Sequence, residues 1–108
     1  MKRGDVVVVA LSGGYGKPRP AVVVEADRFL EDFESLLICP MTSDSASHSV
    51  ARIPVAPTSS TGLTSRSSIM IDKLTVVAKS KVSRVIGRLD EGTLERLDSS
   101  LSTFLDLR

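Results

Sequence analysis

The sequence predicts a mainly β protein, a small antiparallel β-barrel with one C-terminal α-helix. Several short runs rich in valine, isoleucine and leucine alternate with glycine, proline and serine, a pattern typical of short strands joined by turns. After residue 90 the pattern changes to leucines at helical spacing. Five or six short strands followed by a single helix fit a barrel that the helix caps.

The composition limits the classes of function. A chain of 108 residues, 42% of them hydrophobic, has room for one modest core, so we expect one domain over residues 1–108. The net charge of +1 means that the chain has no overall excess of positive charge to attract nucleic acid. Any site for a polyanion must therefore be a local cluster of basic residues. No run approaches the roughly 20 apolar residues that span a membrane, so no membrane partner is expected. The single cysteine, Cys39, lies in an apolar run as a small buried hydrophobe would, and it fits a reducing cytoplasm.

Three strands are predicted in the first half. Residues 5–11 hold four consecutive valines and should be buried on both faces. After a glycine-rich connection, residues 21–25 repeat the pattern. Residues 27–34 predict a helical turn, and residues 35–40 a third strand. That strand should end at Pro40, because proline cannot donate to a strand ladder, and residues 41–45 should form a polar tip.

The second half holds weaker strand signals and the helix. Residues 48–55 indicate a short edge strand, residues 69–77 give the longest strand signal, and residues 81–86 form a last strand that stops at Gly87. Asp90 is a good N-cap. The apolar face of the helix comprises Leu94, Leu97, Leu101, Phe104 and Leu105.

Most familiar catalytic sites are excluded by the residues present. One cysteine and one histidine are too few soft ligands for zinc. No phosphate-binding glycine motif follows a strand and opens a helix. His48 lies in a serine-rich loop with nothing to orient it, and no nucleophile elbow accompanies the many serines. We therefore expect no metal and no cofactor.

Arg19 is the strongest candidate for chemistry. Pro18 and Pro20 restrict its backbone, and its guanidinium fork suits a phosphate. Thr42 and Ser43 follow the third strand, so neighbouring second and third strands would place the fork and two hydroxyls around one pocket. RNA carries its own nucleophile, the ribose 2′-hydroxyl, so a protein that only positions the phosphate and stabilises charge can accelerate cleavage. A surface arginine and a hydrogen-bonding turn threonine remain the alternative.

The chain resembles the MazF/PemK (Kid) toxin family of bacterial toxin–antitoxin systems. The motifs that carry the resemblance come in family order and span most of the chain. They are Arg3-Gly4-Asp5-Val6-Val7, Lys17-Pro18-Arg19-Pro20-Ala21-Val22-Val23, Cys39-Pro40-Met41-Thr42-Ser43, Thr61-Gly62-Leu63 and Ile69-Met70-Ile71-Asp72-Lys73-Leu74.

The resemblance implies a fold and an activity. The fold would be a homodimeric, SH3-like, CcdB-PemK-like antiparallel barrel. Our own hypothesis is that residues 69–77 and the terminal helix build the dimer interface. The activity would be that of an mRNA interferase, which cuts single-stranded RNA at short sequences without a metal and leaves a 2′,3′-cyclic phosphate and a 5′-hydroxyl. Translation and growth would be inhibited until a cognate antitoxin binds, and DNA would be contacted only through that antitoxin.

The resemblance also implies roles for individual residues. Arg19 matches the catalytic arginine, as general acid and phosphate ligand, and Thr42 matches the threonine that steadies the scissile phosphate. Asp72 matches an aspartate that assists the site in Kid-like members, with a structural or dimer contact as the alternative. Lys17 would meet a phosphate and Tyr15 a base, and both could equally be plain loop residues. The adjacent Ser43 joins the RNA-binding set.

Two departures and two alternatives accompany the resemblance. The first loop, residues 12–17, lacks the acid that serves some members as a base, and Met70 replaces the arginine of the Arg-x-Asp pair. A non-enzymatic CcdB-like gyrase poison is one alternative, although the chain has no tryptophan for the tail of such poisons. A barrel that binds nucleic acid without catalysis is the other.

Overall fold

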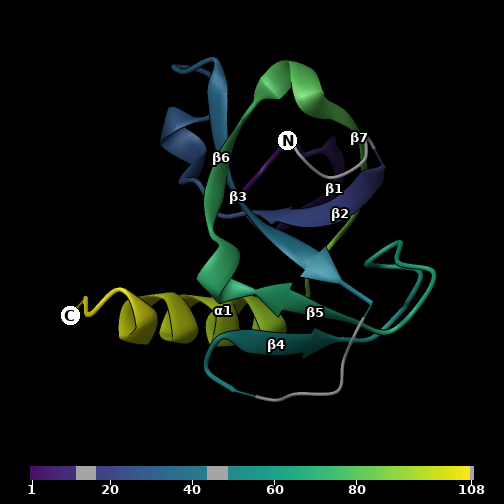
Figure 1. The fold of residues 1–108 in the computed structure, drawn as a ribbon, viewed down its shortest axis with the longest axis vertical. Helices are drawn as coiled ribbons and strands as arrows, with labels where there is room; N and C mark the ends of the chain where they lie inside the picture. Colours follow the sequence, from purple (N-terminus) through teal and green to yellow (C-terminus); the bar gives the residue numbers. More distant parts are fainter. Residues whose placement is uncertain (12–16, 44–48, 108) are drawn as a thin grey trace.

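A computed structural model describes residues 1–11, 17–43 and 49–107. In the described part the strands form one curved layer, and the only α-helix packs beside its lower end (Figure 1). The strands are β1 (Asp5–Ala10), β2 (Pro18–Val23), β3 (Ser35–Thr42), β4 (Arg52–Val55), β5 (Ser67–Met70), β6 (Thr75–Ala78) and β7 (Val82–Arg88). The helices are α1 (Glu91–Phe104) and the 3₁₀ turns η1 (Asp27–Phe29), η2 (Ile71–Lys73) and η3 (Lys79–Lys81).

The strands pair in the order β4-β5-β3-β2-β1-β7, with β6 also pairing with β3. Every one of these pairings is antiparallel. The predicted fold class, a mainly β antiparallel sheet with one C-terminal helix, is therefore confirmed. None of the helices in the described residues is long and apolar enough to cross a membrane.

β1 is buried on both faces, as its valines predicted. Val6 belongs to a core cluster that includes Leu97 of α1, whereas Val7 and Val9 belong to a second cluster on the opposite face. Alternate residues of a strand point to opposite faces, so three of the four consecutive valines supply the two clusters, and Val8 is half-buried. β1 therefore lies between the two core clusters.

β3 is longer than predicted, because Pro40 does not end it. One edge of β3 pairs with β6 up to Ile38 and with β5 from Met41 onward, and Pro40 lies between these two partners. On the other edge Pro40 pairs with Ala21 of β2. The missing N–H thus falls in the gap between β6 and β5, where a proline is tolerated. The predicted polar tip was also wrong at its start, since Met41 is fully buried.

The longest strand signal, residues 69–77, was wrong as one strand. It is divided into β5 and β6 by η2. From the pair Met41↔Ile69 to the pair Ile38↔Thr75, β3 moves back three residues while the opposite chain advances six. The extra residues of the opposite chain form the turn η2. This turn carries that chain from β5, which pairs with the end of β3, to β6, which pairs with its start. Apolar periodicity cannot reveal such an insertion, because η2 itself contains the buried Ile71.

Other predicted boundaries shift by a few residues. β2 begins at Pro18, so Arg19 is part of the strand. β4 is shorter than predicted and lies at the sheet edge, as expected. β7 runs through Gly87, which does not stop it. At Gly87 a Cβ would lie 2.2 Å from the carbonyl carbon of Thr61, so the glycine permits a close approach between chain segments.

α1 begins as predicted. The Asp90 carboxylate accepts a 2.7 Å hydrogen bond from the backbone N–H of Thr93. This bond lowers the pKa of Asp90, because it favours the charged form. Leu97 is fully buried, but Phe104 and Leu105 on the same face remain about half exposed, at 47% and 45%. The last turn of α1 therefore extends beyond the core of this chain.

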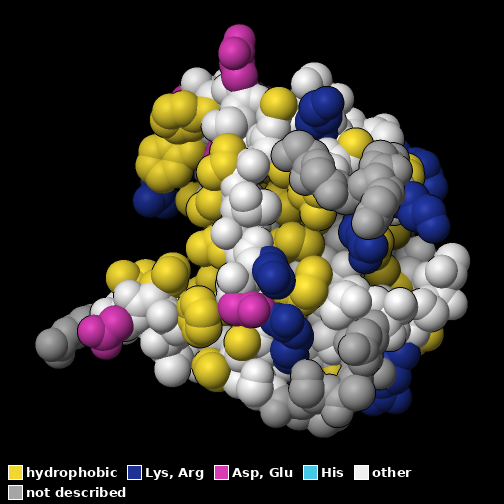
Figure 2. Space-filling view, viewed as in Figure 1, with side chains coloured by type: hydrophobic (Ala, Val, Ile, Leu, Met, Phe, Trp, Pro, Cys, Tyr) yellow, Lys and Arg dark blue, Asp and Glu magenta, His cyan; other side chains and the backbone are white. Residues whose placement is uncertain are grey.

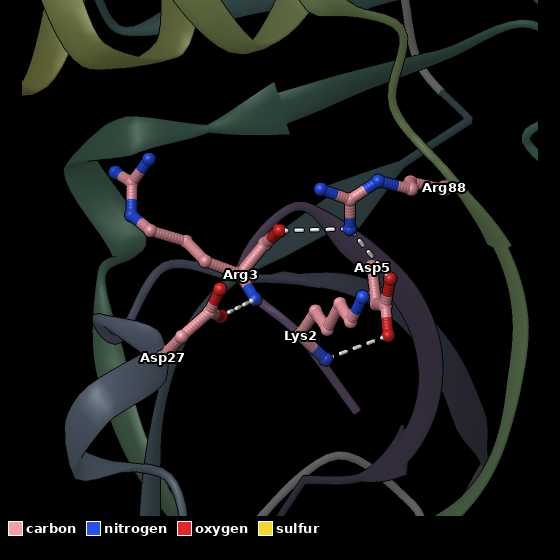
Figure 3. A network of polar contacts seen from close by, with 5 residues as sticks. All are labelled: Lys2, Arg3, Asp5, Asp27 and Arg88. Atoms are coloured by element: carbon pink, nitrogen blue, oxygen red, sulfur yellow. Dashed lines mark hydrogen bonds and ion pairs between the residues drawn. The ribbon is translucent and has the colours of Figure 1, made fainter.

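A polar network fixes the N-terminal segment (Figure 3). The backbone N–H of Arg3 donates to Asp27, and its carbonyl oxygen accepts from Arg88 of β7. The Arg3 side chain donates to the Val24 carbonyl and pairs with Asp98 of α1 at 2.7 Å. Arg3 thereby joins the residue that follows β2 to η1, β7 and α1, which gives the Arg3-Gly4-Asp5 motif a structural role.

Candidate functional site

The sheet register places Arg19 and Thr42 on one face. Ala21 of β2 lies opposite Pro40 of β3, so these two side chains share a face. Arg19 precedes Ala21 by two residues and Thr42 follows Pro40 by two, so both continue on that face. The prediction that neighbouring strands two and three would bring this arginine and this threonine together is consistent with the register.

The same row continues across the sheet. Thr42 lies opposite Ser68 of β5, and Ser68 lies opposite Pro54 of β4. The Ser68 side chain is fully buried, and its hydroxyl has no hydrogen-bond partner among the described residues. Nothing in the sequence marked this hydroxyl, because Ser68 precedes the predicted strand of residues 69–77 and a local pattern does not record which strands pair.

Arg19 is exposed although it belongs to a strand. It pairs with Val9 of β1, whereas pairing with β3 begins only at Ala21. Among the described residues, one edge of β2 therefore has no strand partner around Arg19, which accommodates the prolines on both sides. An exposed guanidinium on a backbone held by a strand partner can bind a phosphate with little loss of conformational freedom.

A cavity of about 300 Å³ brings together three of the predicted residues, Lys17, Arg19 and Ser43. Its other polar lining residues come from the segment before β5 and its first residue, namely Thr64, Ser65 and Ser67. Two cations and several hydroxyls around one hollow provide donors for an anion. Thr42 does not line this cavity. Its neighbours Met41 and Ser43 do, so by strand alternation the Thr42 side chain points to the other face of β3.

A second cavity of about 270 Å³ also reaches Arg19, and Arg84 of β7 lines it. Sequence reasoning missed Arg84. No sequence motif surrounds Arg84. It comes near Arg19 only because β1 pairs with both β2 and β7.

Asp72 is placed differently from the other predicted residues. It lies in η2 and forms an ion pair with Arg52 of β4. Neither cavity beside Arg19 is lined by Asp72. Its predicted contact with RNA stays a prediction, and the structural alternative has this ion pair in its support. Tyr15 and His48 lie outside the described residues.

The sequence of this chain matches a known protein family. Residues 2–105 match the family of PemK-like, MazF-like toxins of type II toxin–antitoxin systems. The chain belongs to this family. The resemblance inferred from the sequence motifs is confirmed.

Relatives of this toxin agree with the match. The probable endoribonuclease MazF of Mycolicibacterium smegmatis is 40% identical over 108 residues, which are 99% of this chain and 98% of that protein. The Mycobacterium tuberculosis toxin MazF-mt6 has a similar structure, with a TM-score of 0.82, 18% identity, and coverage of 96% of this chain and 98% of that one. A MazE-MazF structure from Deinococcus radiodurans gives a TM-score of 0.82 at 16% identity, with coverage of 100% and 98%. At such low identity the structural likenesses concern the fold.

The toxin's one cysteine has no sign of reactivity. Cys39 is fully buried in β3, as predicted. Burial raises the pKa of its thiol to about 11, and the positive charge of Arg3 acts in the opposite direction. Because the thiolate is the nucleophile, Cys39 is a packing residue of the core.

Proposed function

We propose that this toxin is a metal-independent endoribonuclease that cuts single-stranded RNA at short sequences. The observation that carries the proposal is the exposed Arg19, which shares a sheet face with Thr42 and a cavity with Lys17 and Ser43. The relative named a probable endoribonuclease, 40% identical over nearly the whole chain, supports it.

The proposed reaction uses the nucleophile of the substrate. The ribose 2′-oxygen attacks the adjacent phosphorus, the bond from phosphorus to the 5′-oxygen breaks, and the products are a 2′,3′-cyclic phosphate and a 5′-hydroxyl. The proton lost by the 2′-hydroxyl goes to a base, and the leaving 5′-oxygen gains one. Negative charge grows on the non-bridging phosphate oxygens between these events, and donors aimed at those oxygens lower the barrier.

Arg19 is assigned the largest role. Its fork can donate two parallel hydrogen bonds to the phosphate. Thr42, which the resemblance matches to a threonine that steadies the scissile phosphate, lies on the same sheet face by register and is assigned a supporting role. The resemblance implied a general-acid role for Arg19, but its planar fork of N–H donors matches phosphate oxygens directly. We therefore assign Arg19 to phosphate binding and charge stabilisation, and Lys17 and Ser43 to holding the flanking strand.

We further propose a homodimer in the cytoplasm, inhibited by a cognate antitoxin. A groove of about 440 Å³ runs between the sheet and the end of α1, beside the ion pair of Arg3 with Asp98. Its apolar lining residues are Val24, Leu37, Leu74, Leu101, Leu105 and Leu107. Figure 2 shows hydrophobic side chains along the hollow above the C-terminal part of α1. An apolar groove beside half-exposed leucines supports an interface between protein chains.

The test is cleavage of a long single-stranded RNA in EDTA by the wild type, Arg19→Ala and Arg28→Ala. Arg28 is an exposed arginine of η1 that lines none of the cavities around Arg19, so its variant controls for loss of charge. We expect discrete cuts with 5′-hydroxyl ends, a rate about 100- to 1,000-fold lower for Arg19→Ala, and an unchanged rate for Arg28→Ala. Intact RNA with the wild type, or equal rates for wild type and Arg19→Ala, would contradict the proposal.

A further inference from the structure

A separate pocket of about 270 Å³ lies between β4 and α1. Two arginines from different elements line it, Arg52 of β4 and Arg96 of α1. The hydroxyl-bearing residues of its lining are Ser49, Ser99 and Ser100. We call it the β4–α1 pocket. None of its lining residues belongs to the cavities around Arg19.

The helix presents its three lining residues together because of their spacing. Arg96, Ser99 and Ser100 are three and four residues apart, and residues so spaced lie on one face of an α-helix. That face is turned to the edge strand β4, which contributes Arg52. The guanidinium groups therefore reach the pocket from two sides, as in sites that grip an anion between two forks.

Both guanidinium groups keep donors for a ligand. Arg96 donates from Nη2 to the Thr93 hydroxyl at 3.3 Å. Arg52 uses Nη1 for its bonds to the Ala51 carbonyl and to Asp72. An arginine has five N–H donors on three nitrogens, so each residue has further donors without a protein partner in the described part of the chain. The Asp72 carboxylate pairs with Arg52 and offsets one of the two positive charges of the pocket.

The sheet connects this pocket to the candidate cleavage site. Pro54 lines the pocket, and it ends the row that runs from the Arg19–Thr42 face through Ser68. Three strand-to-strand steps, from β2 through β3 and β5 to β4, separate the ends of this row. At about 4.8 Å per step the backbones at the two ends of the row are roughly 14 Å apart. Because Ser68 in this row is fully buried, RNA would follow the surface outside the row and span a somewhat longer distance, which a few nucleotides can cover.

We propose that the β4–α1 pocket binds a backbone phosphate of the RNA strand that flanks the cut. The inference rests on the proposed ribonuclease function and adds a subsite to it. Two arginine forks and several hydroxyls are the groups that most often contact phosphate oxygens, and a groove of positive charge that follows the backbone is the usual way to hold a single strand. A carboxylate-rich protein segment would meet the same donors, and the experiment separates the two.

The experiment measures binding and cleavage by Arg96→Gln, Arg96→Lys and the control Arg28→Gln. Arg96 is exposed on α1, so its substitution should leave the fold intact, which circular dichroism checks. Binding uses RNAs whose 2′-hydroxyl at the mapped cut is replaced by hydrogen, extended one nucleotide at a time on either side. Each is titrated at several salt concentrations by fluorescence anisotropy.

We expect Arg96→Gln to weaken binding about five- to tenfold for RNAs long enough to reach the pocket. The loss should appear with extension on one side of the cut only. The slope of log K against log salt should fall by about 0.7, the value for one phosphate contact on a single strand. The ratio kcat/KM should fall in parallel on long RNA, Arg96→Lys should recover part of the affinity, and Arg28→Gln should match the wild type.

Three outcomes would overturn the inference. If the wild type cuts RNA but Arg96→Gln and Arg28→Gln bind every RNA alike, the pocket is not a phosphate subsite and the ribonuclease proposal stands. If Arg96→Gln binds RNA normally but loses affinity for the antitoxin, the pocket belongs to a protein partner. If the wild type neither binds nor cuts RNA, the ribonuclease proposal fails and this subsite fails with it.

Discussion

Arg19 is held by covalent and tertiary constraints together. The adjacent prolines restrict its backbone, and pairing with Val9 of β1 fixes the strand it belongs to. The sequence was sufficient to single out this residue because a proline on each side is a local signal. Arg84 shares a cavity with Arg19 and could not be found in the same way, because only the pairing of distant strands brings it there.

A second residue-scale expectation concerns Cys39. Burial raises its pKa from 9.0 to about 11, so at pH 8 the native protein should hold about 100-fold less thiolate than the unfolded chain. A disulfide reagent such as DTNB should therefore react at least about 100-fold faster in urea than in buffer. Equal rates would show that the thiol is accessible and ionised in the native state.

The same shift has a consequence for stability. The unfolded chain loses the thiol proton near pH 9.0, before the folded chain does, so the stability that this group contributes is complete below pH 9.0 and declines as pH rises towards about 11.

At the scale of elements, one contact holds the loop that lines the Arg19 cavity. Gly62 has a φ of +71°, and a Cβ there would lie 2.0 Å from the carbonyl oxygen of Ile86 in β7. Across the same contact, a Cβ on Gly87 would lie 2.2 Å from the carbonyl carbon of Thr61. The next residues along, Leu63 and Thr64, line both cavities beside Arg19. The loop is thus positioned by backbone packing against β7.

Gly87→Ala should break this contact. Because the neighbouring atoms are backbone and cannot turn away, we expect the free energy of unfolding to fall by more than about 2 kcal/mol in urea denaturation. Gly92→Ala is the matched control, since a Cβ at Gly92 meets only the Asp90 carboxylate oxygen at an ordinary 3.6 Å. Alanine favours the helix, so Gly92→Ala should be neutral or more stable. Similar losses in both variants would mean that the close approach is unimportant.

At the scale of the whole molecule, apolar surface remains uncovered at the end of α1. Leu105 and Leu107 are 45% and 61% exposed, and both line the groove beside the sheet. Leu74 and Leu101 line the same groove from η2's end and from α1. A second copy of the chain would remove these side chains from water, which supports the proposed homodimer.

Leu107→Asp should weaken that association. The wild type should have twice the 11.6 kDa mass of the chain in sedimentation at micromolar concentration, and Leu107→Asp should shift towards the monomer. Phe33→Asp is the control, because Phe33 is similarly exposed, at 55%, and does not line the groove. A monomeric wild type, or equal effects of the two variants, would argue against this interface.

Local patterns in the sequence were enough to predict the class of fold, the cap and start of α1 at Asp90, and the burial of Cys39, and they single out Arg19 as the candidate for chemistry. These depend on local signals, such as the N-cap hydrogen bond, the valine runs and the flanking prolines, which act over a few residues. Tertiary structure alone decided that β3 passes through Pro40, that η2 divides residues 69–77, and that Asp72 pairs with Arg52. The physical reason is the same in each case. Which strand occupies each edge of β3, and which side chain meets Asp72, depends on segments far apart in the chain, and no local pattern records that pairing.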